Sequence, residues 1–305
     1  MHALRERLVA YELDARPDLA RFHPREVRAS LLRAWLDVEL GRIGDRAFAE
    51  GFARACPRND APPEAYWPRV LEGTPTLLAG IRFKGGDRAQ PFVELIAWDG
   101  PLPAWDALRQ RLAAAFAQFA PRRLRLRLPG EAPPPGSAVE LDQWLVAGRV
   151  AELRRQPRSA ALATRSAADL ACFEAFCAAY RAWQAGAGPL GAEVQPASRE
   201  ELEACLESGA VVLVEAEGAW AGLAAAERQA ERGLRGFCVV EELLDAPLRG
   251  QGRAAALQRA LIDALPAEED DVLWGTIHGI NAPSLRTARR VGREVVEGWW
   301  FVGLA

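Results

Sequence analysis

The chain has 305 residues, of which 50% are hydrophobic and 26% are charged. This length predicts about two domains, each able to bury a core of its own. The net charge of −3 offers no attraction to nucleic acid or to an anionic membrane, so neither is an expected partner. No apolar run has the length of a signal peptide or a membrane span. The five cysteines form no Cys-x-x-Cys pair, which indicates reduced thiols, a cytoplasmic location and no structural metal.

The first half alternates helical and extended patterns. Hydrophobic spacing predicts helices over three segments: 24–56, 105–119 and 137–148, the last with Ser137 and Glu140 as a capping box. Alternation and β-rich composition predict extended segments at four places: 76–84, 92–98, 124–128 and 150–153. Pro157 stands in an arginine-rich stretch where we place the domain boundary. The expected domains are therefore 1–155 and 156–305.

The second half begins again with a short strand. Strands are predicted over 160–164, 211–215, 220–227, 236–244, 272–278 and 294–302. Helices are predicted over 167–183, 198–208, 252–265 and 283–291, with Ser198 and Glu201 as a capping box. The glycine-rich stretch 186–191 is expected to be a loop beside the substrate, with Trp183 near it.

A glycine-rich turn lies between a predicted strand and a predicted helix. It reads Arg249-Gly250-Gln251-Gly252-Arg253-Ala254. The two glycines allow a tight turn and a close approach of the backbone to a ligand. The helix that follows begins with unpaired N–H groups and the positive end of its dipole. Such a turn is a ready site for phosphate.

The pattern Arg-x-x-Gly-x-Ala, filled by Arg249, Gly252 and Ala254, resembles the acyl-CoA loop of the GNAT superfamily of N-acetyltransferases. A second family signature follows in order, at Asn281, Ser284 and Gly292. The resemblance covers about 160–305. It implies an α/β (α+β) fold in which a mixed, mostly antiparallel sheet is flanked by helices. It also implies acetyl-CoA as the acyl donor, without a metal.

The resemblance implies a set of residues that contact the donor: Leu243, Leu244, Arg249, Gly250, Gln251, Gly252, Arg253, Ala254, Asn281 and Ser284. Backbone N–H groups of the turn would hold the diphosphate, and the Leu244 N–H would polarise the thioester. The guanidinium groups of Arg249 and Arg253 match phosphate geometry, although Arg253 equally suits solvent. Asn281 and Ser284 would contact the pantetheine arm, cap the next helix, or do both.

An amine must be neutral to attack a thioester, so the site needs a group that accepts its proton. The commonest base position of the family falls on Cys238, whose thiol substitutes poorly for a carboxylate. On a regular strand Cys238, Val240, Glu242 and Leu244 share one face, and Glu241 faces the other way unless a bulge exchanges the two. We expect Glu242 to be the catalytic base. A solvated or ion-paired Glu242 is the alternative.

His278 is the second catalytic candidate. It lies on the strand that ends at Asn281, facing the gap where two strands part in the family. There it would relay a proton or contact the substrate; a histidine satisfied by backbone groups is the alternative. Ala288 stands where the family often has a tyrosine that protonates the leaving thiolate, so water or another group would do so here.

The element order of the first half repeats that of the second. In place of the glycine turn it has Asp99-Gly100-Pro101-Leu102-Pro103, whose prolines remove N–H donors. We hypothesise that the first half is a degenerate GNAT-like copy that cannot hold CoA. An unrelated accessory α/β domain is the alternative.

One long strand follows Gly292, where the family has a two-strand finish. A bare outer edge on this strand would favour aggregation. We therefore expect a neighbour to pair with 295–302, either from the first half or from a second copy in a homodimer.

Together these patterns predict an N-acetyltransferase. It would move an acetyl group from acetyl-CoA to a primary amine, on a small molecule or a peptide, by direct attack in a ternary complex. The alternatives are a non-catalytic acyl-CoA-binding sensor or interaction module, and a scaffold whose turn binds nothing.

Overall fold

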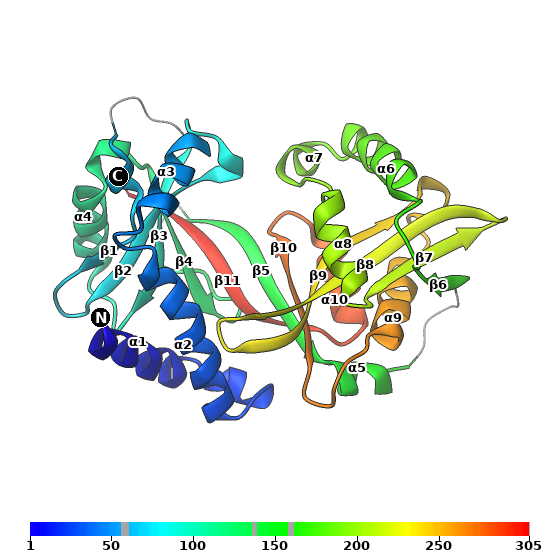
Figure 1. The fold of residues 1–305 in the computed structure, drawn as a ribbon, viewed down its shortest axis with the longest axis horizontal. Helices are drawn as coiled ribbons and strands as arrows, with labels where there is room; N and C mark the ends of the chain where they lie inside the picture. Colours follow the sequence, from blue (N-terminus) through cyan, green and yellow to red (C-terminus); the bar gives the residue numbers. More distant parts are fainter. Residues whose placement is uncertain (56–60, 136–138, 158–161, 305) are drawn as a thin grey trace. The chain divides into compact units, whose positions relative to one another are not determined.

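The computed structural model describes residues 1–55, 61–135, 139–157 and 162–304 (Figure 1). The chain forms two compact units. Unit 1 comprises Met1–Asp142, Glu231–Gly233 and Glu297–Ala305, and unit 2 comprises Gln143–Ala230 and Leu234–Val296. Neither unit is one continuous stretch of chain, because each takes a strand from the other half of the sequence.

Unit 1 is a sheet with helices. Its helices are α1 (His2–Ala15), α2 (Arg25–Gly41), α3 (Arg46–Ala55) and α4 (Trp105–Ala115). Its strands are β1 (Arg69–Leu71), β2 (Leu77–Phe83), β3 (Pro91–Trp98), β4 (Arg123–Pro129) and most of β11 (Glu294–Gly303), in the order β1-β2-β3-β4-β11. Short 3-10 turns lie at Pro17–Arg21, Pro63–Tyr66, Lys84–Gly86 and Ala117–Phe119.

The core of unit 1 lies between helices α1 and α2 and the sheet. Leu8 on α1 and Leu32 and Leu36 on α2 pack against Leu78 and Ile96 of the sheet. The arginines that alternate along β4 are half-buried, and two of them, Arg125 and Arg127, form ion pairs with the buried Glu94. Burial alone would raise the pKa of Glu94, but the charges of Arg125, Arg127 and Arg82 hold it well below its usual value.

Unit 2 has the larger set of elements. Its helices are α5 (Val150–Arg155), α6 (Phe173–Gly186), α7 (Pro189–Glu193), α8 (Arg199–Glu207), α9 (Ala254–Ala264) and α10 (Ala282–Arg290). Its strands are β5 (Val139–Arg149), β6 (Thr164–Ser166), β7 (Val211–Ala216), β8 (Ala219–Glu231), β9 (Leu234–Leu244) and β10 (Val272–His278). Their order is β6-β7-β8-β9-β10-β5, and a 3-10 turn lies at Ala246–Leu248.

Helices cover both faces of the unit 2 sheet. Val211 and Leu213 of β7 pack with α6 and α8 in one cluster. The residues between and after them, Val212 and Val214, pack with α9 in another cluster. Side chains alternate between the two faces of a strand, so a continuous apolar run on β7 is what two covered faces require.

The prediction for the chain between Ser137 and Leu153 is wrong. Ser137 lies outside the described residues, but the segment expected to be a helix is β5, and the segment expected to be extended begins α5. β5 pairs antiparallel with β10 from Gln143 to Arg149. Its buried residues recur at every second position, at Asp142, Trp144 and Val146, so pairing with a distant strand overrides the local helical signal.

Most other elements lie where the sequence predicts them. The expected helix over 24–56 is two helices, separated near Gly44 with its φ of +80°. The expected loop 186–191 includes the start of α7. The prediction that a neighbour pairs with the last strand is confirmed: Glu297–Gly303 of β11 pair antiparallel with β4, from the first half of the same chain.

The two units share one strand–helix–strand arrangement. β3 and β4 are parallel and joined through α4, and β9 and β10 are parallel and joined through α9. In each unit an antiparallel strand from the other half of the sequence then pairs with the second member, β11 with β4 and β5 with β10. This repeated order is the one that the hypothesis of a degenerate copy expects, and the hypothesis itself stays a prediction.

Candidate functional site

The predicted site residues gather at one cavity in unit 2. It has a volume of about 650 Å³, within the usual range of small-molecule sites. β9, β10, α6, α9 and α10 all contribute to its wall. Its lining includes every predicted catalytic and donor-binding residue except Gln251: Glu242, Leu243, Leu244, Arg249, Gly250, Gly252, Arg253, Ala254, His278, Asn281 and Ser284.

The cavity opens where β9 and β10 part. The two strands pair in parallel only from Gly236 to Cys238, opposite Val272 to Trp274. Beyond that register the two strands no longer pair, and Val239–Leu244 of β9 and Gly275–His278 of β10 line the cavity. The expected parting of the strands is therefore confirmed, and it creates a slot between two backbones.

The glycine turn has the conformation that its sequence requires. Gly250 has a φ of +74° and Gly252 a φ of +72°, in the region that favours glycine. α9 begins at Ala254, and no side chain caps its first turn. The first N–H groups of a helix have no partner within it, so these donors suit the diphosphate of an acyl-CoA. Gln251 stands outside the wall and donates from Nε2 to the Pro247 carbonyl at 2.7 Å.

Arg249 stabilises the turn through two hydrogen bonds to backbone carbonyls. Its Nε donates to the Leu244 carbonyl at 2.6 Å, and its Nη2 donates to the Ala179 carbonyl at 3.4 Å. These bonds tie the end of β9 to the turn and to α6. The side-chain contact to phosphate expected of Arg249 stays a prediction, as does that of Arg253.

Three further arginines line the cavity, and the sequence analysis did not select them: Arg286, Arg290 and Arg293. Arg286 and Arg290 are exposed on α10, four residues apart and therefore on one face of the helix. Within the described residues, neither they nor Arg253 form an ion pair. The spacing of Arg286 and Arg290 is the signal that could have identified these two residues. With Arg253 they place three cations that form no ion pair within the described residues beside a helix start, and such cations suit phosphate groups.

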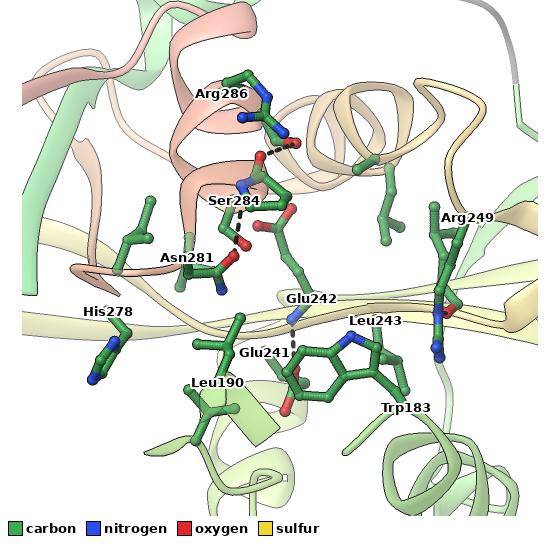
Figure 2. A pocket seen from close by; sticks show the side chains of 18 of the residues that line it. Trp183, Leu190, Glu241, Glu242, Leu243, Arg249, His278, Asn281, Ser284 and Arg286 are labelled. Carbon is green, nitrogen blue, oxygen red and sulfur yellow. Dashed lines mark hydrogen bonds between the residues drawn. The ribbon is translucent and has the colours of Figure 1, made fainter. Parts of the chain in front are cut away.

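Asn281 caps α10. Its Oδ1 accepts the Ser284 N–H at 3.2 Å, so the capping interpretation is confirmed. Both residues also line the cavity, and their contact with the pantetheine arm stays a prediction. Figure 2 shows Asn281, Ser284 and Arg286 on the same side of β9.

Glu242 faces α9. Its carboxylate accepts a hydrogen bond from Gln258 of that helix, and its Oε1 has no hydrogen-bond partner among the described residues. Burial raises the pKa of Glu242, whereas the charge of the buried Arg293 and the Gln258 bond lower it. The role of Glu242 as base is untested and stays a prediction.

Glu241 lies on the opposite side, toward α6 and α8. Its Oε2 accepts the Ala197 N–H at 3.1 Å and its Oε1 accepts the Glu242 N–H at 2.9 Å. Burial raises the pKa of Glu241 to about 7, although these two hydrogen bonds lower it. Among the described residues it forms no ion pair that would favour its charged form.

The expected alternation along β9 breaks down at Val240. Leu244 packs in the cluster with α9, whereas Val240 packs in the cluster with α6 and α8. Val240 and Glu241 are consecutive, yet both lie on the α6 side. The expectation that Val240 shares a face with Glu242 and Leu244 is therefore wrong, because the strand is irregular where it leaves its pairing with β10.

His278 lines the cavity at the end of β10. Its Nε2 lies 3.6 Å from Oε2 of Glu193 on α7, and its Nδ1 faces the Ile280 N–H at 3.4 Å. The backbone contact agrees with the alternative of a histidine held by main-chain groups. Its catalytic role stays a prediction.

Neither a metal site nor a membrane-spanning helix is found among the described residues. No group of His, Cys, Asp and Glu among them could hold a metal ion. No helix among them is long and apolar enough to cross a bilayer.

Comparison with known proteins gives solved structures only. No family model and no curated protein matches the chain. It is similar to a GCN5-related N-acetyltransferase from Sphaerobacter thermophilus, with 15% identity, a TM-score of 0.48, and 87% of this chain and 92% of the other covered. It is also similar to a GCN5-related N-acetyltransferase from Kribbella flavida, with 18% identity, a TM-score of 0.46 and coverages of 77% and 89%.

A third structure is a tandem GNAT protein from the clavulanic acid biosynthesis pathway, at 12% identity and a TM-score of 0.40, with 86% of this chain and 97% of the other covered. All three likenesses are low, so the fold assignment depends on the strand order, the parted strands and the glycine turn described above. On that geometry the chain has a GNAT-like mixed α/β fold.

Proposed function

We propose that unit 2 transfers an acyl group from acyl-CoA, with acetyl-CoA as the expected donor, to a primary amine. The observation that carries the proposal is the convergence of three features on one cavity. These are the slot between the parted strands, the glycine turn with its two positive-φ residues, and the uncapped start of α9.

The donor would lie with its charged end at α9 and its thioester in the slot. N–H groups after Gly250 would bind the diphosphate, and Arg253, Arg286 and Arg290 would neutralise phosphate charge. The Leu244 N–H would donate to the thioester oxygen, where negative charge gathers in the transition state.

The chemistry requires that the amine nitrogen forms a C–N bond as the C–S bond breaks. The starting ammonium gives up two protons, one to a base and then to solvent, and one to the leaving thiolate. Ala288, where the family often has a tyrosine, is fully buried and has no acidic group, so water would relay the second proton from the nitrogen to the thiolate. β9 supplies two carboxylates that could serve as the base, Glu242 and Glu241.

The absence of a tyrosine at Ala288 keeps one alternative open, a non-catalytic acyl-CoA sensor. Two measurements separate the proposals. Acetyl-CoA at a hundred times its dissociation constant should stabilise the protein by about 2.7 kcal/mol, seen as a raised Tm. Release of the CoA thiol with a panel of primary amines should then exceed thioester hydrolysis. Binding without thiol release favours the sensor. If acetyl-CoA neither raises the Tm nor releases its thiol, the turn has no acyl-CoA ligand.

A further inference from the structure

The two sides of the cavity differ in charge. The side formed by the turn and α10 carries Arg253, Arg286 and Arg290. Within the described residues, the part of the wall from α6, α7 and the segment after α7 is uncharged: Tyr180, Trp183, Ala187, Leu190, Val194 and Gln195. Figure 2 shows Trp183 and Leu190 across β9 from Ser284 and Arg286. An anionic donor and a cationic acceptor would therefore bind to different sides.

Glu241 is the acidic group on the uncharged side. Its carboxylate lies with Trp183 and Leu190 below β9 in Figure 2, and the residue is 8% exposed. The two backbone N–H groups of Ala197 and Glu242 fix its position. An ionised carboxylate has about four acceptor sites, so two bonds leave acceptor capacity for a ligand.

Among the residues that the structure describes, no cation forms an ion pair with this carboxylate. Arg249 reaches toward α6, but its Nε and Nη2 donate to the carbonyls of Leu244 and Ala179. In the described part of the chain Glu241 forms no ion pair. A buried carboxylate without a cation favours a ligand that brings one.

We propose that Glu241 binds the ammonium group of the acceptor and removes its proton, and that the acceptor is a primary amine on an apolar body without a carboxylate. This inference rests on the proposed acyl transfer and names its acceptor side. The proton passes from the nitrogen to Glu241 and then to solvent. The neutral amine attacks the thioester carbon, the sulfur leaves with the bonding electron pair, and the second proton of the nitrogen passes to the leaving thiolate.

The surroundings of Glu241 suit a base that works near neutral pH. Tyr180 faces it from α6, Cys205 and Glu201 act on it from α8, and Glu242 is its neighbour on β9. None of these groups is a cation, and burial raises the pKa of Glu241 to about 7. At neutral pH a base with this pKa is partly ionised, and it is still strong enough to accept a proton.

The uncharged side of the cavity favours an acceptor with an apolar body. The Tyr180 and Trp183 rings contact each other at 5.3 Å between centroids and offer an aromatic surface to an apolar body. A carboxylate on the acceptor would lose its hydration without gaining an ion pair from the α6 and α7 part of the wall, and it would face Glu241 as a like charge.

The first test compares two acceptors that differ only in a carboxylate, phenethylamine and phenylalanine. With acetyl-CoA, kcat/KM for phenethylamine should exceed that for phenylalanine by at least about 100-fold, because like charges opposed in a site are strongly disfavoured. The substitution Trp183→Ala should raise KM for phenethylamine while changing KM for ethylamine little. Equal or better use of phenylalanine overturns the proposal.

The second test separates the two carboxylates. For phenethylamine, kcat/KM of the wild type should fall about tenfold per pH unit below pH 7. Glu241→Gln should lower kcat/KM at pH 7 and move the pH at which kcat/KM levels off from near 7 toward the pKa of the free amine, because only the neutral amine attacks. The control Glu242→Gln should keep the change of slope near pH 7. Loss of this change of slope in Glu242→Gln alone would assign the base to Glu242 and overturn the proposal.

A binding readout needs no turnover. With CoA present, phenethylamine should raise the Tm of the wild type and leave that of Glu241→Gln unchanged; a shift with phenylalanine instead overturns the inference. These failures differ from a failure of the proposed function, in which acetyl-CoA itself would not stabilise the wild type.

Discussion

Gly250 holds a backbone conformation that other residues adopt only with strain. Its φ is +74°, and an added Cβ would meet nothing within 4 Å. Gly250→Ala therefore distorts the turn without a clash, at a cost of about 1–3 kcal/mol. We expect acetyl-CoA to bind at least about tenfold more weakly, since 1.4 kcal/mol is tenfold, as measured by titration calorimetry.

Gly218 provides a matched control. Its φ is +78°, its Cβ position is equally open, and it does not line the cavity. Gly218→Ala should carry a similar strain and leave the affinity for acetyl-CoA unchanged. Equal loss of affinity in both variants would mean that strain anywhere in unit 2 weakens binding.

Glu241 should also make the free energy of unfolding depend on pH. Its pKa is about 7 in the folded chain and ordinarily 4.5, so between these pH values the folded state holds a proton that the unfolded state releases. Stability from this group is therefore full below pH 4.5 and is lost as the pH rises through 7. Relative to Glu241→Gln, the wild type should lose about 3 kcal/mol over this window. Urea unfolding at pH 5 and pH 8 measures it, and a constant difference between the two proteins would refute it.

At the scale of elements, the two arginines of α10 form one cationic face. Arg286 and Arg290 both line the cavity, whereas the neighbouring Arg289 does not. Replacing both Arg286 and Arg290 by Gln should weaken acetyl-CoA binding by about tenfold or more and flatten its dependence on salt, because screened charge attraction is removed. Arg289→Gln is the control. The same loss from Arg289→Gln would mean that the overall positive charge of α10, and not the two arginines at the cavity, attracts acetyl-CoA.

Elements with local signals could be predicted from the sequence, and elements formed by distant partners could not. The capping box of Ser198 and Glu201 places the start of α8 correctly, because both partners lie within one turn. β5 resembles a capped helix locally, but its partner β10 is more than a hundred residues away. The glycine turn could be located because glycine is required there. Residue spacing also places Glu241 opposite Glu242 and Leu244, whereas no spacing shows the irregularity that turns Val240 toward α6.

At the scale of the whole chain, the exchange of strands makes each unit depend on the other half of the sequence. β5 gives unit 2 the partner of β10, and its Trp144 and Val146 are buried. Each buried apolar side chain of this kind contributes about 2 kcal/mol. A fragment of residues 156–305 lacks β5 and leaves the edge of β10 unpaired.

We expect this fragment to aggregate or to unfold without cooperativity, whereas a fragment of residues 139–305 should be more soluble and should retain some acetyl-CoA binding. Circular dichroism melting and titration calorimetry compare the two. A cooperative 156–305 fragment with full affinity would show that β5 is dispensable and that the sequence boundary near residue 155 is the physical one.

The proposed function depends most on where the donor binds. The decisive measurement is a crystal structure of the protein with acetyl-CoA. We predict one molecule per chain, with its diphosphate within about 3 Å of backbone nitrogens between Gly250 and Ala255 and its thioester between β9 and β10. The prolines at 101 and 103 predict no second molecule in unit 1. A donor bound elsewhere, or an empty turn in crystals grown with saturating acetyl-CoA, would contradict the central claim.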